Sequence, residues 1–136
     1  MVAASARDAV RDAGVVITML PTADVVESVI IDGGAAARGY VWAQMGTIGV
    51  EATRRIRDRL AEQRLGVMFV DAPVSGSKGP AEQGQLLILA SGPAAAADAV
   101  RPVFDILGRK TVWLGEAGGP GRRPMTGLDY LARPRR

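Results

Sequence analysis

The sequence predicts an α/β protein with a doubly wound, mostly parallel sheet. Short apolar runs rich in β-branched residues alternate along the chain with longer segments of helical periodicity. The apolar runs are nearly continuous rather than alternating, which is typical of strands buried on both faces of a parallel sheet. With 136 residues, 48% of them apolar and 23% charged, the chain has the size and composition of one soluble globular domain.

Four segments, one before the first expected strand and three between strands, have the spacing of amphipathic helices. The strands are residues 15–20, 40–45, 67–70, 86–90 and 111–114, and the helices are residues 5–13, 23–31, 50–64 and 93–107. Thr22 is expected to cap the second helix, because its hydroxyl can accept a free N–H of the first turn. The third helix is the clearest, since Ala52, Ile56 and Leu60 form an apolar stripe opposite arginines and acidic side chains.

The fourth helical segment contains Pro102, which predicts either a kink or a helix that restarts there. Gly108 is expected to end this helix. From residue 115 onward the periodicity fails, and glycine, proline and arginine become frequent. We therefore expect an irregular Arg/Pro-rich tail over residues 118–136.

Ligands of a doubly wound sheet bind beside the carboxyl ends of its strands. The residues that follow the expected strands are 21–22, 46–47, 71–77, 91–92 and 115–121, and they are rich in glycine, serine and threonine. Composition alone does not assign a function to them, because loops of α/β proteins are commonly made of these residues.

Several classes of function are disfavoured by composition. The chain has no cysteine and no histidine, and its carboxylates form no cluster, so no metal site is expected. No apolar run is long enough to span a bilayer, and no secretory signal is visible, so a cytoplasmic location is expected. Basic and acidic residues balance over residues 1–114, and the net charge of +3 arises in the tail, so nucleic acid is not an expected partner.

A glycine-rich phosphate-binding turn is missing from the sequence. Dinucleotide-binding sheets normally open with a strand, a Gly-x-Gly-x-x-Gly turn and a helix whose N-terminus holds the pyrophosphate. A charged residue at the end of the second strand then contacts the ribose. Neither feature is present, so we expect the second portion of a Rossmann-like sheet that lacks the first βαβ unit.

The most specific motif is DAPVSGSKGPAEQG at residues 71–84. Together with AGVVITMLPTADVVESV at 13–29 and YVWAQMGTIGVEATRRI at 40–56, it resembles the β-hydroxyacid dehydrogenases, the family of 3-hydroxyisobutyrate dehydrogenase. The resemblance implies that Ser75, Gly76 and Ser77 bind the substrate carboxylate, with Ser77 in place of a family glycine. Free N–H groups and a hydroxyl suit that role. The alternative is a structural loop in an unrelated α/β domain.

The resemblance also implies contacts to the cofactor, NAD or NADP. Leu20 and Pro21 match a family Met-Leu-Pro at a strand end, and Thr47 matches the threonine of Asp-x-Ser-Thr on the nicotinamide side. Gln44 and Gly46 replace the Asp and Ser of that motif. Two alternatives remain: the proline only separates a strand from a helix, and the threonine only caps a helix.

The catalytic lysine of the family has no counterpart in this sequence. Residues 99–121 resemble the last helix and strand of the cofactor domain, which in the family lead to Lys-x-x-x-Asn, whose lysine is the acid/base catalyst. Arginines follow here instead, and the only lysines are Lys78 and Lys110. Arginine is a poor acid/base because it stays protonated. No catalytic residue is assigned, and the family's C-terminal all-α domain is not recognisable.

The resemblance implies hydride transfer between NAD(P) and a small 3-hydroxy acid such as 3-hydroxyisobutyrate. Residues 1–117 are then expected to form part of a Rossmann-like NAD(P)-binding domain, with a truncation or frameshift of the gene explaining the missing parts. The alternative is a catalytically dead remnant that acts at most as a binding or interaction module. An uncovered sheet edge would favour self-association of such a module.

Overall fold

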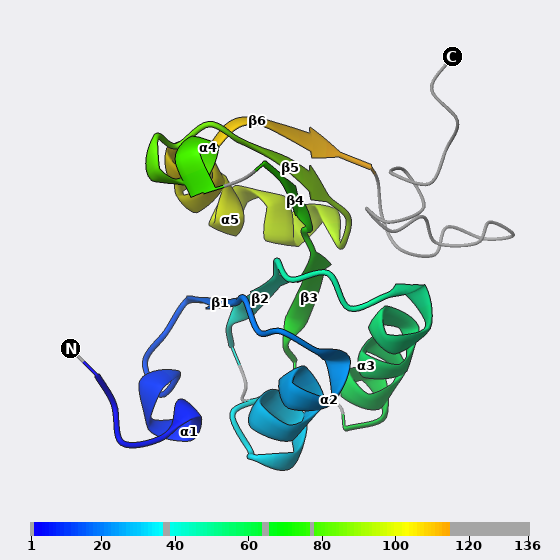
Figure 1. Ribbon diagram of the computed structural model, residues 1–136. Coiled ribbons are helices and arrows are strands. Elements are labelled where there is room, and N and C mark those ends of the chain that lie inside the picture. Colours follow the sequence, from blue (N-terminus) through cyan, green and yellow to red (C-terminus); the bar gives the residue numbers. More distant parts are fainter. Residues whose placement is uncertain (1, 37–38, 64–65, 77, 115–136) are drawn as a thin grey trace, which may run out of the picture.

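A computed structural model describes residues 2–36, 39–63, 66–76 and 78–114 (Figure 1). The expected tail at 118–136 and the end of the expected domain therefore lie outside the described residues. The strands are β1 (Val15–Thr18), β2 (Val41–Gln44), β3 (Met68–Asp71), β4 (Val74–Ser75), β5 (Leu86–Ala90) and β6 (Gly108–Trp113). The helices are α1 (Ala6–Ala9), α2 (Ala23–Val26), the π-helix η1 (Glu27–Asp32), α3 (Val50–Gln63), α4 (Lys78–Glu82) and α5 (Ala94–Leu107).

The strands form two three-stranded sheets that meet at one point. The order β1-β2-β3 is parallel throughout, whereas in β4-β5-β6 the first pair is antiparallel and the second parallel. Asp71 and Ser91 join the two sheets, because each backbone N–H donates to the other's carbonyl, at 2.9 and 2.8 Å. The predicted α/β class and mostly parallel sheet are confirmed.

All five predicted strands are present; β5 has the predicted ends, and the other four differ. The largest difference is at β6, which starts at Gly108 immediately after α5. The helix ends there as predicted, but through extended backbone rather than a left-handed turn. A Cβ at position 108 would lie 2.8 Å from the Leu86 carbonyl oxygen, so glycine lets the chain enter the sheet at once. The short elements β4 and α4 were not predicted.

The predicted helix over 23–31 is divided into α2 and η1. Thr22 caps it as predicted, since its hydroxyl accepts the Val25 N–H at 3.3 Å. At the other end the Gly33 N–H donates to the Ser28 carbonyl, five residues earlier, at 2.8 Å. Pro102 lies within α5, which runs without interruption, so the helix does not restart there.

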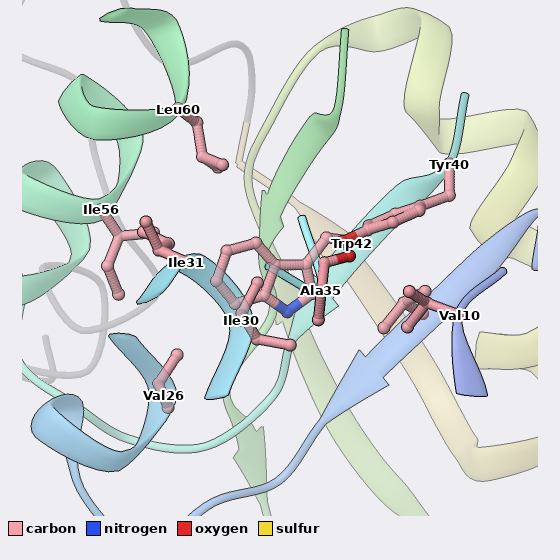
Figure 2. Packing of buried hydrophobic residues seen from close by; sticks show 10 residues of the cluster. Val10, Val26, Ile30, Ile31, Ala35, Tyr40, Trp42, Ile56 and Leu60 are labelled. Carbon is pink, nitrogen blue, oxygen red and sulfur yellow. Dashed lines mark hydrogen bonds between the residues drawn. The ribbon is translucent and has the colours of Figure 1, made fainter. Parts of the chain in front are cut away.

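Two apolar clusters lie on opposite faces of the first sheet, because successive side chains of a strand point to opposite faces. Tyr40 and Trp42 belong to the first cluster (Figure 2), which also contains residues of η1 and α3. Val41 and Ala43 belong to the second, with Ala96, Val100 and Phe104 of α5. Helices therefore cover both faces of the sheet, as expected for a doubly wound fold.

Candidate functional site

Three loops leave the same edge of the first sheet. Thr18, Gln44 and Asp71, the last residues of β1, β2 and β3, stand in register. Beyond them the Met45 N–H donates to the Thr18 carbonyl at 3.0 Å, and the Ala72 N–H donates to the Gln44 carbonyl at 2.9 Å. The loops after β1, β2 and β3 are therefore held side by side at the edge where doubly wound sheets bind ligands.

The loops that follow β1 and β2 are in close contact at Gly46. This residue is buried, and a Cβ built on it would lie 3.0 Å from the Leu20 carbonyl oxygen. A Cβ at that distance would be a tight contact, so glycine at position 46 lets the two loops approach without displacing either. The structure thus brings together the segments of the predicted cofactor residues: half-buried Leu20, exposed Pro21 and exposed Thr47.

The two alternatives for these residues have different outcomes. Thr47 does not cap a helix, because α3 begins only at Val50 and the residue before it is Gly49. Its exposed hydroxyl therefore has no capping role. Pro21 does lie between a strand and a helix, directly before the cap residue Thr22, so its position is compatible with both interpretations.

Ser75 and Gly76 lie farther along the chain, on the second sheet. After Asp71 the chain continues through Ala72 and Pro73 into β4, where Ser75 pairs with Leu87 of β5. Both Ser75 and Gly76 are exposed, and Gly76 has a φ of +142°. Ser77, the third residue predicted to bind substrate, lies outside the described residues.

A buried polar cluster below the loops was missed in the sequence. Thr18, Trp42 and Gln44 are hydrogen-bonded to one another, and the Gln44 Nε2 donates to the Gly46 carbonyl at 2.9 Å. Gln44 and Trp42 are fully buried and Thr18 nearly so. The sequence did contain one indication of this cluster, a glutamine and a threonine at the ends of otherwise apolar strands. Buried polar side chains are rare unless they are hydrogen-bonded, so two of them in such strands indicate a pair.

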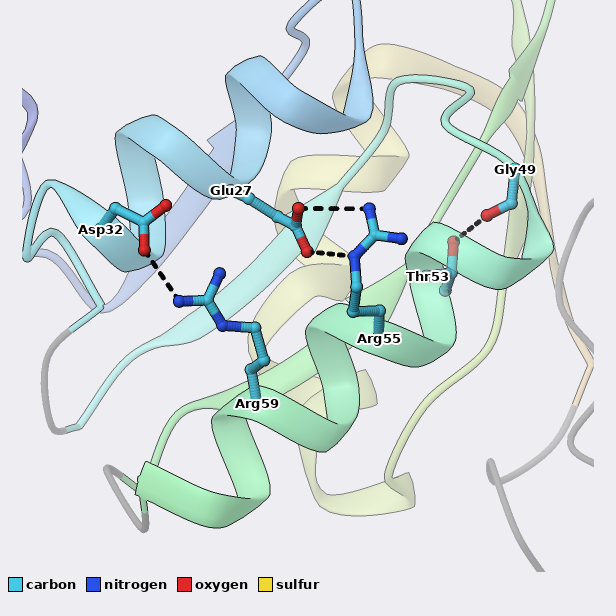
Figure 3. Close-up of polar contacts among 6 residues, drawn as sticks. All are labelled: Glu27, Asp32, Gly49, Thr53, Arg55 and Arg59. Carbon is cyan, nitrogen blue, oxygen red and sulfur yellow. Dashed lines mark hydrogen bonds and ion pairs between the residues drawn. The ribbon is translucent and has the colours of Figure 1, made fainter.

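The resolved pKa shifts lie on α3, behind the loops (Figure 3). Hydrogen bonds from Arg55 to Glu27 and from Arg59 to Asp32 raise the pKa of each guanidinium. These pairs join α3 to η1 and have a structural role. Over the described residues no group of three or more acidic side chains is placed to hold a metal ion, and no helix is long and apolar enough to cross a membrane.

Two hollows are notable on the described surface. One of about 230 Å³ lies along β1 and is lined by residues that include Ile17, Met19 and Leu20. Another, of about 450 Å³, lies between α5 and β6, where Phe104 and Trp113 contribute to its wall. Only the first contains a residue predicted to contact cofactor or substrate.

A doubly wound sheet with close-packed loops at its carboxyl edge defines the class of dinucleotide-binding α/β domains. The chain belongs to the family described as the NAD binding domain of 6-phosphogluconate dehydrogenase, whose model matches residues 1–115. NAD or NADP is thus the cofactor that the family implies.

Curated relatives agree with the predicted resemblance. The chain is 37% identical over 120 residues to an NAD-dependent L-serine dehydrogenase of Pseudomonas aeruginosa, covering 85% of the chain and 40% of that protein. It is 36% identical over 118 residues to a 3-hydroxyisobutyrate dehydrogenase of the same organism, covering 84% and 39%. The chain therefore spans about two fifths of the length of these relatives.

Solved structures confirm the fold. The Mycobacterium tuberculosis 3-hydroxyisobutyrate dehydrogenase, studied with L-serine, matches with a TM-score of 0.75 and 35% identity over 83% of this chain and 38% of that one. A Salmonella typhimurium 3-hydroxyisobutyrate dehydrogenase matches with a TM-score of 0.77 and 25% identity, over 94% and 42%.

The described residues fit one end of a dinucleotide. Leu20, Pro21 and Thr47 offer apolar and hydroxyl contacts on loops that approach each other closely at Gly46. A pyrophosphate requires several free backbone N–H groups of a glycine-rich turn. No described strand is followed by Gly-x-Gly-x-x-Gly, so the described residues offer no such turn.

Proposed function

We propose that this chain supplies the nicotinamide-facing and substrate-facing parts of a NAD(P)-dependent 3-hydroxyacid dehydrogenase site. The observation that carries the proposal is the close approach of the β1 and β2 loops at Gly46 and Leu20. This approach holds Leu20, Pro21 and Thr47 on one edge of the sheet, where ligands of doubly wound folds bind. Family membership makes NAD or NADP the dinucleotide that the edge receives.

The relatives' names favour a substrate with a carboxylate and a hydroxyl on the third carbon. L-Serine and 3-hydroxyisobutyrate, named for the relatives from P. aeruginosa, share both groups. The exposed Ser75 hydroxyl and the backbone beside Gly76 can donate hydrogen bonds to such a carboxylate. Ser77 belongs to the same proposed contact.

The chain's own residues would bind and orient the reactants. When bound, the nicotinamide accepts a hydride from the substrate's hydroxyl carbon, and the hydroxyl proton must pass to a base. Neither lysine is placed for that step: Lys78 lies on α4, 3.8 Å from the Glu82 carboxylate, and Lys110 lies exposed on β6. The proposal therefore assigns this chain binding contacts and no catalytic residue.

Cofactor titration tests the proposal directly. We expect NADH or NADPH to bind saturably, seen as a change in nicotinamide fluorescence and a rise in melting temperature with ligand concentration. Thr47→Ala should raise the Kd about tenfold, because it removes a contact worth about 1.4 kcal/mol. Ser28→Ala is the matched control, since it removes an exposed hydroxyl on η1, away from the edge.

Two outcomes would contradict the proposal. Absence of saturable binding by both NADH and NADPH would reject the cofactor site, as would equal affinities of the Thr47 and Ser28 variants. Turnover of L-serine or 3-hydroxyisobutyrate by the purified chain would instead show that it contains an acid/base that we have not assigned.

A second candidate is an interaction module without catalysis, favoured by the outer edge of β1. This strand ends the β1-β2-β3 sheet in the described part of the chain, and Ile17 and Met19 are 43% and 58% exposed. We propose that β1 pairs with β1 of a second copy, because antiparallel pairing about a two-fold axis satisfies the backbone groups of both edges and brings the exposed apolar side chains of the two copies side by side. Such pairing is concentration-dependent.

The mass of the particle in solution tests this pairing. Size-exclusion chromatography with light scattering should detect a dimer of the wild-type chain, and Ile17→Lys should shift it to the monomer. Ile106→Lys is the control, because Ile106 is 77% exposed on α5, away from β1. A wild-type monomer at all accessible concentrations, or equal effects of both lysines, would reject the pairing.

A further inference from the structure

The buried cluster of Thr18, Trp42 and Gln44 has a fixed direction of hydrogen bonding. The Trp42 Nε1–H can only donate, and it donates to the Thr18 hydroxyl oxygen at 2.8 Å. Thr18 therefore donates its own proton to the Gln44 Oε1. The side-chain NH2 of Gln44 must then face the Gly46 carbonyl, which accepts a hydrogen bond from Nε2 at 2.9 Å.

This direction explains why an amide suits position 44. A carboxylate could accept from Thr18, but it could not donate to the Gly46 carbonyl, and two oxygens would then face each other. The Gln44 side chain is fully buried, so water cannot take the place of a hydrogen bond that a substituted side chain fails to make there. The side chain thus couples the end of β1 to the backbone of the next loop.

The cluster ends at the contact between the two proposed cofactor loops. The Gln44 side chain donates a hydrogen bond to the Gly46 carbonyl. Gly46 in turn lies against the loop after β1, since a Cβ built on it would be 3.0 Å from the Leu20 carbonyl oxygen. A second bond, from the Met45 N–H to the Thr18 carbonyl at 3.0 Å, joins the same two strand ends. Thr47 follows directly, with an exposed side chain.

We propose that Thr18, Trp42 and Gln44 are positioning residues that hold the Gly46–Thr47 backbone against Leu20 for contact with the nicotinamide end of the cofactor. The inference deepens the proposed function and rests on it for the identity of the ligand. The hydrogen bonds of the cluster all join residues of this chain, so the positioning can be measured without cofactor.

Tyr40 offers a control that separates positioning from stability. Its hydroxyl is buried in the same apolar cluster and donates to the Ala35 carbonyl at 2.7 Å. It lies next to the opposite end of β2, before Val41, far along the strand from Gly46. Tyr40→Phe and Thr18→Val each remove one buried hydroxyl. Thr18→Val should cost more stability, because the Thr18 hydroxyl makes two hydrogen bonds, but Tyr40→Phe still shows whether loss of a buried hydroxyl by itself disturbs the loop.

The experiment measures backbone order and cofactor affinity in the full chain. In the wild type, ¹⁵N relaxation should give amide order parameters of about 0.85, the value of a rigid backbone, at Gly46 and Thr47. Thr18→Val should lower them below about 0.6 and raise the Kd for NADH or NADPH about tenfold. Thr18→Ser, which keeps the hydroxyl, should retain both values, and Tyr40→Phe should leave both unchanged.

Cofactor affinity tests the proposed function, whereas the order parameters test the positioning of the loop. If the wild type binds neither cofactor, the proposed function fails, while the order parameters still decide whether the cluster positions the loop. Unchanged order at Gly46 and Thr47 in Thr18→Val would overturn the inference. Should Thr18→Val not fold, Gln44→Met carries the same test. Loss of folding in both, with Tyr40→Phe folded, would assign the cluster to stability alone and also overturn it.

Discussion

At the scale of single residues, Gly76 shows how one position limits the chain directly after β4. Its φ of +142° is a backbone conformation that residues with a side chain rarely adopt. A Cβ there would also lie 2.8 Å from the Leu86 Cδ2 and 3.4 Å from the Pro80 Cβ. Glycine is thus favoured by its backbone conformation at the residue that follows the proposed carboxylate contact, Ser75, and a side chain there would also have to displace the end of the Leu86 side chain.

Replacement of Gly76 should therefore destabilise the fold. We expect Gly76→Ala to lower the free energy of unfolding by about 1–3 kcal/mol, from backbone strain and the contact with Leu86. Gly79→Ala is the matched control: it lies in α4, with no atom within 4 Å of its Cβ position, and should be neutral or stabilising by about 0.5–1 kcal/mol. Urea unfolding of both variants is the measurement, and equal effects would contradict the assignment.

At the scale of elements, α3 is fastened to the π-helix η1 by two ion pairs (Figure 3). Arg55 bonds both carboxylate oxygens of Glu27, at 2.7 and 3.2 Å, and Arg59 bonds Asp32 at 2.7 Å. The arginines are four residues apart on α3 and so share a face. Their partners are five residues apart, the spacing of a π-helical turn. The π-helix thus presents both carboxylates to one face of α3.

The contribution of these pairs should not depend on pH near neutrality. Hydrogen bonding to Glu27 raises the pKa of Arg55 above its already high ordinary value. A group with a raised pKa stabilises the fold fully below its pKa in the unfolded chain, and this stabilisation is lost only as the pH rises through its pKa in the folded chain. Both pKa values of Arg55 lie far above neutrality, so the arginine stays charged from about pH 6 to 9. The difference in melting temperature between the wild type and Arg55→Met should therefore be constant over that range and shrink in 1 M NaCl.

Arg57→Met provides the comparison for that measurement. Arg57 lies on the same helix but outside the two ion pairs with η1. A difference that varies with pH for Arg55→Met, or one as small and as salt-insensitive as that for Arg57→Met, would show that the pair with Glu27 does not stabilise the contact between α3 and η1.

At the scale of the whole molecule, β2 ties the two apolar clusters together. Trp42 lies in the cluster under α3 and η1 (Figure 2). Its ring packs edge-on against Phe69, with centroids 5.0 Å apart. Val41 and Ala43, its neighbours in the chain, lie in the cluster under α5. Because a single strand contributes to both, loss of one cluster should expose the other.

Unfolding should accordingly be a single cooperative transition. The chain has two tryptophans, Trp42 in the first cluster and Trp113 packed against the second. In Trp113→Phe, tryptophan fluorescence reports the first cluster alone, while far-UV circular dichroism reports all helices and strands. We expect coincident midpoints in urea. A fluorescence midpoint that clearly differs from that of circular dichroism would show that the two clusters unfold independently.

The sequence by itself determined the fold class, the five principal strands, the cap at Thr22 and the family. Those features depend on local periodicity, on short-range capping and on contiguous motifs, all of which are visible in the order of residues. The resemblance also located the loops that follow β1, β2 and β3. The structure pairs Ser75 with Leu87 of β5, and the contacts of Ser75 and Gly76 with substrate remain a prediction.

Tertiary structure alone decided what lies beneath those loops. The π-helical turn at Glu27–Asp32, the short strand at Val74–Ser75 and the immediate start of β6 at Gly108 all depend on neighbours distant in the chain. The same holds for Thr18 and Gln44, which are 26 residues apart and meet only because parallel pairing aligns the ends of β1 and β2. Spacing along the chain carries no record of that register, so the cluster that holds Gly46 against Leu20 is visible only in the folded molecule.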